Sequence, residues 1–495
     1  MNDKKEFKKE MYERFLFNKN GEKDDKIKYI SETLFFDNDV LWEVVYDGTN
    51  TKFVAWDGKN FQYESFFNVG ENEIVVPIMD DSVTEKAVLL PEKPEKFDNI
   101  EELVKEIQEH IHKYCDVGKD FETFATYYIL LSWIYDKLDT IPYLRVRGDT
   151  GTGKSRFLTV VGSLLYKASI VAGAVTPAPI YRIIKRWKGS IILDEADWEK
   201  SDEKNEVITI LNCGFERNKP VIRCSKDNPD EIQFLPTFSP KLIATRQSFS
   251  DKALESRCIS EIMKQTRRKD IPPLLPKKYY EESMKLRNKL LYFRLLYYNK
   301  INTENIEKIE LGKNIEPRLK QAFLNFAVLF YNIPELFERF KKFIERYQTE
   351  IVEERSQSLD GQIVNTIFDM LGVTTVTEVT LYMESLLTCN QIAEKLKNDG
   401  WKVTPSIIGR RIKSLGLKTI PKKIEGKTQR IIDLNSDILQ DLFIRYVPTP
   451  TKTNNNKIQE NPYISVTSVT TVTEKKNDEW IEEIKPDGKR ILRRK

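Results

Sequence analysis

The sequence predicts an α/β fold built on a parallel sheet, with a β-rich segment before it and a small helical domain with a hairpin after it. Between about 140 and 265, short apolar strands alternate with helical segments, which is the rhythm of a parallel sheet covered by helices. Residues 31–95 carry strand-like segments joined by Asp-Gly turn signals at 47–48 and 57–58. Residues 388–433 show two helix-capping patterns followed by two strands. The expected core strands are 143–146, 169–172, 190–193 and 241–244.

The elements before the core follow from hydrophobic spacing. Apolar residues recur at helical intervals over about 100–114, and a largely apolar helix is expected over about 121–138. Alternating and β-branched residues mark the N-terminal strands, which we assign to one β-rich domain. These strands are 40–46, 52–56, 61–63, 73–79 and 86–90.

Composition limits the class of protein. The chain has 495 residues, enough for roughly three or four domains. Its 79 Lys and Arg residues nearly balance 76 Asp and Glu residues, so the net charge of +3 does not by itself indicate a nucleic-acid partner. Five scattered cysteines without a CxxC pair, together with only two histidines, argue against a zinc site and favour a cytoplasmic protein. We expect no membrane-spanning segment, because no apolar run reaches about 18 residues.

A phosphate-binding motif, G-x-x-x-x-G-K-[ST], lies between the first core strand and a helix. Glycines there let backbone N–H groups turn toward phosphates, and the following helix points its positive end at the same place. We expect Lys154 to contact the β- and γ-phosphates of ATP and Ser155 to bind Mg²⁺. The motif consists of Gly148, Asp149, Thr150, Gly151, Thr152, Gly153, Lys154 and Ser155.

Two carboxylates end the apolar strand 190–193, and they favour hydrolysis over simple nucleotide binding. Asp194 is expected to hold Mg²⁺ and Glu195 to act as the general base for water. Thr245, at the end of the strand 241–244, is a candidate sensor of the γ-phosphate, or else an ordinary strand end. Arg257 could stabilise transition-state charge on a neighbouring subunit's nucleotide, or it could be a surface or lid-pairing arginine.

The ordered motifs at 148–155, 190–195, 241–245 and 253–257 resemble those of AAA+ ATPases, with spacing similar to superfamily 3 and minichromosome-maintenance-type helicases. The longer set of motifs over about 97–300 is similar to the primase-associated helicase domains of plasmids and proviruses. The resemblance implies a P-loop NTPase core of the AAA+/ASCE class, with a helical lid.

The same resemblance implies a ring, usually a hexamer, with ATP bound between subunits. Arg257 would then act in trans and Thr245 would be the first sensor, although many relatives have Asn there. A second sensor arginine should lie in the lid, with Arg318 the first candidate and Arg287 the second.

A hairpin is expected just before the sensor strand, with strands at about 219–224 and 231–235. In related motors such a hairpin touches DNA. Its phosphate-contacting candidates are Arg217, Lys219, Arg223 and Lys226. The alternative is a solvated hairpin whose charges have no special role.

The sequence after the core predicts a winged helix-turn-helix. Thr388 and Thr404 are expected to cap two helices, and residues 417–433 to form a hairpin wing. Between Lys395 and Arg430 the sequence has eleven Lys or Arg and two acids, which suits contact with phosphates. The alternatives are a protein-binding winged helix and a plain charged surface. The DNA-binding candidates are Arg410, Arg411, Lys413 and Lys427.

The sequence therefore predicts an ATP-dependent DNA motor, a replicative-type DNA helicase of a mobile element that uses ATP and Mg²⁺. Its expected partners are single-stranded or forked DNA and further copies of itself in a homo-hexamer. The alternatives are an ATP-switched DNA-binding regulator and an AAA+ remodelling or loading factor. The expected parts are an N-terminal β-rich domain (1–95), the ATPase core (96–265), the lid (266–350), the winged helix-turn-helix (357–445) and a linker with a basic tail (446–495).

Overall fold

The computed structural model divides the chain into two units, residues 1–448 and residues 449–495. In the first unit it describes residues 28–448, apart from 71, 172–175, 195–201, 226–227, 229, 305, 313–314, 377, 379–385 and 425–426. In the second unit it describes one antiparallel hairpin, formed by β18 (Trp480–Ile484) and β19 (Arg490–Arg494).

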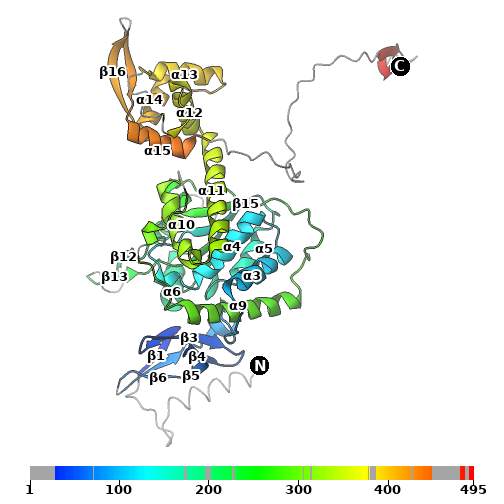
Figure 1. The fold of residues 1–495 in the computed structure, drawn as a ribbon, viewed down its shortest axis with the longest axis vertical. Coiled ribbons are helices and arrows are strands. Elements are labelled where there is room, and N and C mark those ends of the chain that lie inside the picture. The colour runs from blue at the N-terminus through cyan, green and yellow to red at the C-terminus, as the bar shows by residue number, and fades with distance from the viewer. Residues whose placement is uncertain are drawn as a thin grey trace, which may run out of the picture. The chain divides into compact units, whose positions relative to one another are not determined.

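Two small sheets form the N-terminal part, drawn in blue in Figure 1. One is a three-stranded sheet in the order β1-β7-β6, and the other is a four-stranded antiparallel sheet in the order β2-β3-β4-β5. The Asp-Gly turns were predicted correctly: Gly48 has a φ of 94°, and the Asp47 carboxylate accepts from the N–H of Thr49 and of Asn50. The strands are β1 (Lys28–Glu32), β2 (Leu34–Asp37), β3 (Val40–Tyr46), β4 (Thr51–Trp56), β5 (Phe61–Glu64), β6 (Phe67–Asn68) and β7 (Glu73–Pro77).

The core is a six-stranded sheet in the order β15-β9-β14-β11-β10-β8, parallel except for β8. The four predicted core strands are present. The predicted strand at 86–90 is different, because its strand β8 pairs with β10 in this sheet and not with the N-terminal sheets. β8 thereby covers an edge that would otherwise leave backbone groups unpaired. The strands are β8 (Val88–Leu89), β9 (Tyr143–Arg147), β10 (Ala168–Val171), β11 (Ile191–Leu193), β14 (Lys241–Thr245) and β15 (Cys258–Ile262).

Helices cover both faces of this sheet because its strands alternate apolar side chains between two separate cores. Leu144, Val146 and Leu242 face one core, whereas Tyr143 and Ile243 face the other. The first core is covered by α3 (Ile100–Tyr114), α4 (Lys119–Ser132), α5 (Lys154–Gly162), α9 (Lys277–Tyr297), α10 (Pro317–Phe330) and α11 (Pro334–Ser356). The second is covered by α6 (Pro177–Trp187), α7 (Asp202–Cys213) and α8 (Lys252–Glu255).

Most helix boundaries agree with their sequence signals. Helix α3 spans the predicted residues, with the Asn99 side chain accepting from the N–H of Glu102. Helix α4 ends at Ser132, before the predicted end at 138, and a short 3₁₀ turn follows over Tyr135–Lys137. Two further short elements are α2 (Asp81–Thr84) and the 3₁₀ turn Ile306–Lys308.

The region after α11 has the predicted helix-turn-helix and wing around its own apolar core. Thr388 and Gln391 form a reciprocal capping box, and Thr404 caps the next helix. Thr388 also bridges to Ile431, which attaches the wing to the start of the first helix. The elements are α12 (Leu359–Leu371), α13 (Cys389–Asn398), α14 (Pro405–Ser414), β16 (Lys418–Ile424), β17 (Lys427–Asp433) and α15 (Ser436–Tyr446).

The predicted fold class is confirmed: a mixed α/β protein with a mainly parallel core sheet, N-terminal β-sheets and a helical C-terminal region. Among the described residues, no helix is both long and apolar enough to cross a membrane.

A buried ionic cluster joins the N-terminal sheets to the core. Glu43 on β3 accepts from Arg294 of α9 (2.6 Å) and pairs with Lys167 (2.8 Å), and these side chains are at most 1% exposed. Asp136 holds the other edge of the Arg294 guanidinium at 2.6 Å, and Lys167 donates to the Thr33 carbonyl. Burial lowers the pKa of Lys167 to about 8, against the attraction of Glu43. Removing any one of these charges would leave its partners buried without full compensation.

A buried histidine makes stability depend on pH. His110 is 4% exposed and stacks on Tyr279, and its Nε2 lies 3.1 Å from the Ser283 hydroxyl. Burial lowers the pKa of His110 to about 4, because the charged ring would be desolvated. The unfolded chain takes up this proton near pH 6.5 and the folded chain only near pH 4. The free energy of unfolding should therefore decrease as the pH is lowered from about 6.5 to about 4, by up to about 1.4 kcal/mol per pH unit.

We expect His110→Asn to remove this term. The shift in urea midpoint between pH 7 and pH 5 should shrink relative to the unmodified chain. Glu109→Gln serves as the control, because Glu109 is exposed on the same helix. Equal pH dependence in His110→Asn and the unmodified chain would contradict the assignment.

Candidate active site

The phosphate-binding loop connects β9 to α5 in the conformation that its glycines permit. Gly148, Gly151 and Gly153 have φ values of 154°, 82° and 91°, in the region that side chains disfavour. At Gly148 a Cβ would also lie 2.7 Å from the Met263 carbonyl oxygen. The loop thus needs glycine for both its turn and its close approach to the segment after β15.

The lysine of the motif lies across this loop. Lys154 Nζ donates to the carbonyls of Gly148 (2.6 Å) and Asp149 (2.8 Å), and the Thr152 hydroxyl donates to the Asp149 carbonyl. Asp149, Thr150 and Ser155 are exposed. Lys154 is therefore held at the loop, where it could transfer its hydrogen bonds to phosphate oxygens.

Thr245 lies next to the loop, at the end of β14. It pairs with Arg147 across the two strands, and its carbonyl accepts from the Gly148 N–H at 3.2 Å. Its hydroxyl is buried and has no hydrogen-bond partner among the described residues. A buried hydroxyl without a partner is costly, so its place fits a group that is satisfied by a bound ligand.

The acidic pair follows β11, which lies beside β14 in the sheet. Asp194 is half-buried and directly follows Leu193, so its backbone lies at the same carboxyl edge as the loop. Ser155 and Asp194 supply the hydroxyl and carboxylate oxygens that suit Mg²⁺. Glu195 lies outside the described residues. The loop glycines, Lys154, Thr245 and Asp194 thus fit a magnesium-bound nucleoside triphosphate.

Arg257 and Arg318 lie at the amino ends of the core strands, whereas the phosphate-binding loop lies at their carboxyl ends. β15 is parallel to β9 with Cys258 opposite Tyr143, so Arg257 sits at the start of these strands, whereas the loop follows their ends. Both guanidinium groups lie over the ring of Phe215. The distance from the guanidinium carbon to the ring centroid is 5.7 Å for Arg257 and 4.6 Å for Arg318. Arg318 thus lies away from the loop of its own chain, and the assignment of Arg318 as the second sensor stays a prediction.

Arg287 is buried at the far end of the loop helix. Its Nη1 donates to the Ser163 carbonyl (2.9 Å), at the C-terminal end of α5, while Lys154 begins that helix. Burial lowers the pKa of Arg287 to about 10. Arg287 therefore caps α5 and packs in the core, and its contacts do not support a sensor role.

The predicted basic contacts of the hairpin are engaged within the chain. The hairpin consists of β12 (Val221–Cys224) and β13 (Ile232–Leu235), and Figure 1 shows it projecting from the core. Arg217 donates to the carbonyls of Leu138 and Tyr135, Lys219 pairs with Glu216, and Arg223 pairs with Glu206. Lys219 and Arg223 are nevertheless exposed and their ion pairs are weak, so contact of Arg217, Lys219 and Arg223 with phosphates stays a prediction. Lys226 lies outside the described residues.

The hairpin also presents an apolar face that was not predicted from the sequence. Ile222 is paired with Phe234, and Cys224 is paired with Ile232 on the same face. Ile222, Ile232 and Phe234 are 61%, 58% and 63% exposed. The alternation of apolar and polar residues in Ile-Arg-Cys (222–224) and Ile-Gln-Phe (232–234) indicates one apolar face on the hairpin. The same pattern is also typical of a buried face.

The winged-helix residues differ in how free they are. Arg410 and Lys413 are exposed on α14, and no ion pair of either is seen among the described residues. Arg411 lies 3.5 Å from the Asp360 carboxylate of α12, so it has a partner within the chain. Lys427 begins β17, and its side chain lies outside the described residues. Exposed lysines at 418, 422 and 423, with Arg430, add positive charge to the wing.

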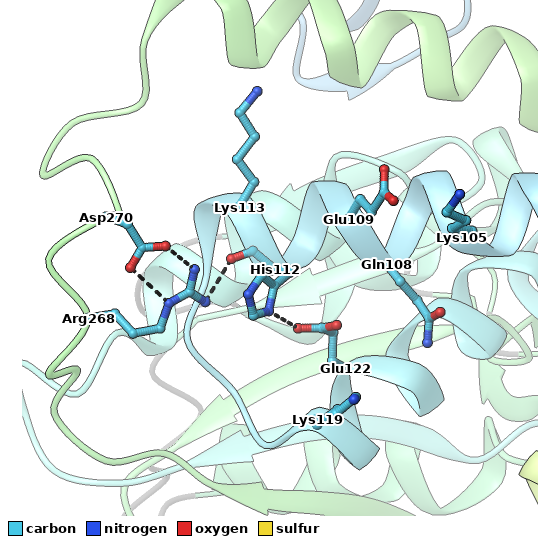
Figure 2. Close-up of a pocket in the computed structure, with 9 residues that line it drawn as sticks. All are labelled: Lys105, Gln108, Glu109, His112, Lys113, Lys119, Glu122, Arg268 and Asp270. Carbon is cyan, nitrogen blue, oxygen red and sulfur yellow. Dashed lines mark hydrogen bonds and ion pairs between the residues drawn. The ribbon is translucent and has the colours of Figure 1, made fainter.

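A separate charged hollow lies between α3, α4 and the segment after β15 (Figure 2). Its charges are largely neutralised locally. His112 Nδ1 lies 2.9 Å from the Glu122 carboxylate, while Arg268 pairs with Asp270 and donates to the His112 carbonyl. Burial raises the pKa of Glu122. The lining residues are Lys105, Gln108, Glu109, His112, Lys113, Lys119, Glu122, Arg268 and Asp270.

Comparison with solved structures finds similar chains at low identity. The C-terminal region (305–718) of NrS-1 in its apo form matches at 12% identity and a TM-score of 0.35, over 80% of this chain and 96% of that one. The SCCmec type IV Cch active helicase matches at 10% identity and a TM-score of 0.38, over 83% and 80%. The JCV helicase bound to a thiazolopyridine compound matches at 11% identity and a TM-score of 0.23, over 50% and 66%. No family model and no curated protein matches the chain.

Proposed function

We propose that this protein is an ATP-driven DNA motor, a replicative-type helicase of a mobile element, that hydrolyses ATP at sites shared between copies of the chain. The observation that carries the proposal is that the parts of the site lie at opposite ends of the core strands. The glycine loop, Thr245 and Asp194 lie at one edge, whereas Arg257 lies at the other. A nucleotide at the loop can receive Arg257 only from another molecule, and the resemblance to ring helicases suggests a homo-hexamer.

The chain's residues supply the parts of a hydrolysis step. Lys154 stabilises the β- and γ-phosphates, and Ser155 and Asp194 would hold Mg²⁺, which would neutralise phosphate charge. Glu195 accepts a proton as water attacks the γ-phosphorus and the bond to the bridging oxygen of ADP breaks. Thr245 donates toward the γ-phosphate, and Arg257 of a neighbouring copy stabilises the transition state.

The test of this function is a fork-unwinding assay with ATPase measured in parallel. We expect strand separation and DNA-stimulated hydrolysis by the unmodified chain, with both activities lost in Lys154→Ala and Glu195→Gln. Robust hydrolysis without unwinding would overturn the helicase proposal, and ATP-dependent binding at one duplex sequence would then favour the regulator. A failure of DNA to bind or to stimulate hydrolysis would favour the remodelling factor.

The winged helix is proposed to bind the DNA backbone through α14 and the wing. We expect Arg410→Ala combined with Lys413→Ala to weaken duplex binding. The slope of log affinity against log salt should fall by about 2, since each lost phosphate contact removes nearly one released counterion. Fluorescence anisotropy over a salt series measures both quantities. Lys342→Ala, an exposed lysine on α11, is the control, and an unchanged slope in the double variant would argue for a protein-binding winged helix.

The hairpin is also proposed to contact bases through its apolar face. Its basic residues have internal partners, whereas Phe234 offers an exposed ring on which a base could stack. We expect Phe234→Ala to weaken single-strand binding by about 1–3 kcal/mol, with little change in salt dependence. Tyr331→Ala, an aromatic residue 49% exposed at the end of α10, is the matched control. Equal affinities for the two variants would contradict base contact.

A further inference from the structure

A buried arginine ties the strand before the phosphate-binding loop to the helix before Arg257. Arg145 on β9 is 0% exposed, and both of its Nη atoms donate to the Glu255 carboxylate at the end of α8, at 2.7 Å from Nη1. Its Nε donates to the Ser260 hydroxyl on the neighbouring strand β15, at 2.8 Å. An arginine that donates two hydrogen bonds to one carboxylate fixes the orientation of both groups. Helix α8 is therefore attached to the middle of the core sheet.

Helix α8 has further attachments around this pair. The Glu255 carboxylate also accepts from the Phe249 N–H at 2.8 Å, and the centroid of the Phe249 ring lies 4.9 Å from the Arg145 guanidinium carbon. Leu254 is 0% exposed, and the Asp251 side chain caps the helix by accepting from the Leu254 N–H at 2.7 Å. A helix of four residues has too few backbone bonds to hold its own direction. These side chains therefore fix the direction of α8.

Arg257 follows α8 closely and is held by it at both ends of the residue. Its backbone N–H donates to the Leu254 carbonyl at 3.0 Å, and its Nη1 donates to the Ala253 carbonyl at 2.5 Å. The ring of Phe215 supports the other side of the guanidinium group. Because two carbonyls of α8 hold Arg257, any tilt of α8 would move the guanidinium group with it.

We propose that Glu255 is a positioning residue for Arg257: its pair with Arg145 holds the Arg257 guanidinium group where the ATP of a neighbouring copy can receive it. This inference rests on the proposed shared ATP site. Glu255 itself acts only through α8. Because Arg145 lies on β9, three residues before Gly148, the loop of a chain and the arginine that the chain offers are attached to the same strand. The pair thereby connects one ATP site to the next.

The first test is Glu255→Gln, which keeps the shape of the side chain and removes its charge. We expect kcat to fall by about 10- to 100-fold, because the transition state loses a correctly placed cation. KM and the affinity for a fluorescent ATP analogue should stay within about 3-fold, because the loop is intact. The matched control is Glu335→Gln, which removes the exposed partner of Arg339 on α11 and should retain full hydrolysis. A loss of ATP affinity of about tenfold or more in Glu255→Gln would place its effect on the loop of its own chain and overturn the inference.

Mixing experiments show on which side of the shared site Glu255 acts. In an equal mixture of Glu255→Gln and Lys154→Ala copies, the intact loop of a Glu255→Gln copy can receive a correctly held Arg257 from a Lys154→Ala copy. Random pairing in a head-to-tail ring gives this arrangement at about a quarter of the interfaces, so hydrolysis should recover to about a quarter of the unmodified rate. A mixture of Glu255→Gln with Arg257→Ala should not recover, because every copy offers a misplaced or missing guanidinium group.

A third mixture, Arg257→Ala with Lys154→Ala, separates this inference from the proposed function. If this mixture recovers but Glu255→Gln with Lys154→Ala does not, the shared site stands and the positioning role of Glu255 is overturned. Recovery of Glu255→Gln with Arg257→Ala would place Glu255 on the loop's side of the site and overturn the role equally. If Arg257→Ala with Lys154→Ala does not recover, the shared site itself fails, and this inference fails with it.

Arg145→Met combined with Glu255→Leu guards against a folding defect, because replacing a buried ion pair with apolar residues often preserves stability. If the pair only stabilises the fold, this double variant should hydrolyse ATP at nearly the unmodified rate, which would overturn the inference. If the pair positions Arg257, the double variant should stay as slow as Glu255→Gln and should recover with Lys154→Ala to the same extent. The thermal midpoint identifies which of the two variants is folded, and the mixtures are made with that one.

Discussion

Replacing Lys154 with alanine is expected to lower ATP hydrolysis by about 100- to 1,000-fold, because one preorganised charge is removed from the developing phosphate charge. Lys154 now lies across the loop carbonyls of Gly148 and Asp149, so its loss removes a cation but no buried packing. Steady-state phosphate release measures the rate, and a fluorescent ATP analogue measures binding.

The matched control is Lys185→Ala, which removes an exposed lysine from α6. This variant should hydrolyse ATP at the unmodified rate, and both proteins should keep the same thermal midpoint. A Lys154→Ala protein that retains more than about a tenth of the activity would contradict the role given to the loop.

Replacing Glu43 with alanine is expected to destabilise the first unit by about 3–5 kcal/mol, the usual cost of removing one partner from a buried ion pair. The change leaves Lys167 and Arg294 buried with one counter-charge fewer, and it removes the acceptor of the Tyr166 hydroxyl. Urea unfolding followed by tryptophan fluorescence provides the midpoint, which is the safer quantity in a chain with several parts.

Glu64→Ala is the control for this change, because Glu64 is exposed on β5 of the same sheet. It should shift the midpoint by no more than about 0.5 kcal/mol in equivalent free energy. A Glu43→Ala protein as stable as the control would show that the buried cluster contributes nothing to holding the sheets on the core.

Short-range signals predicted much of the fold. The apolar spacing of α3 and the caps at Thr388 and Thr404 depend on residues close in sequence, and these elements formed as predicted. The strand at 86–90 was placed in the wrong sheet because its partner, β10, lies about eighty residues away and nothing local specifies the pairing. Helix α4 likewise ends earlier than predicted, at Ser132, whose hydroxyl accepts from the N–H of Tyr166, a residue that no local signal brings near.

The part of the candidate site that consists of consecutive residues could be predicted from the sequence. The loop glycines and Lys154 could be read directly because spacing and backbone conformation are linked there. The partners of Arg217, Arg223 and Arg318 could not, because a long cation can reach any of several groups that only the tertiary fold brings near. Charge alone therefore did not predict these internal partners, nor the exposed ring of Phe234.

The edge strand β8 and the Glu43 cluster also bear on how this protein could have been assembled by recombination. A cut between residues 95 and 96 would strip β10 of its antiparallel neighbour and leave Lys167 buried without Glu43. The exposed edge would then invite pairing with another chain. The N-terminal sheets are thus tied to the core sheet, and any exchange of the core segment between chains would have to carry β8 and the acidic partner of Lys167 with it.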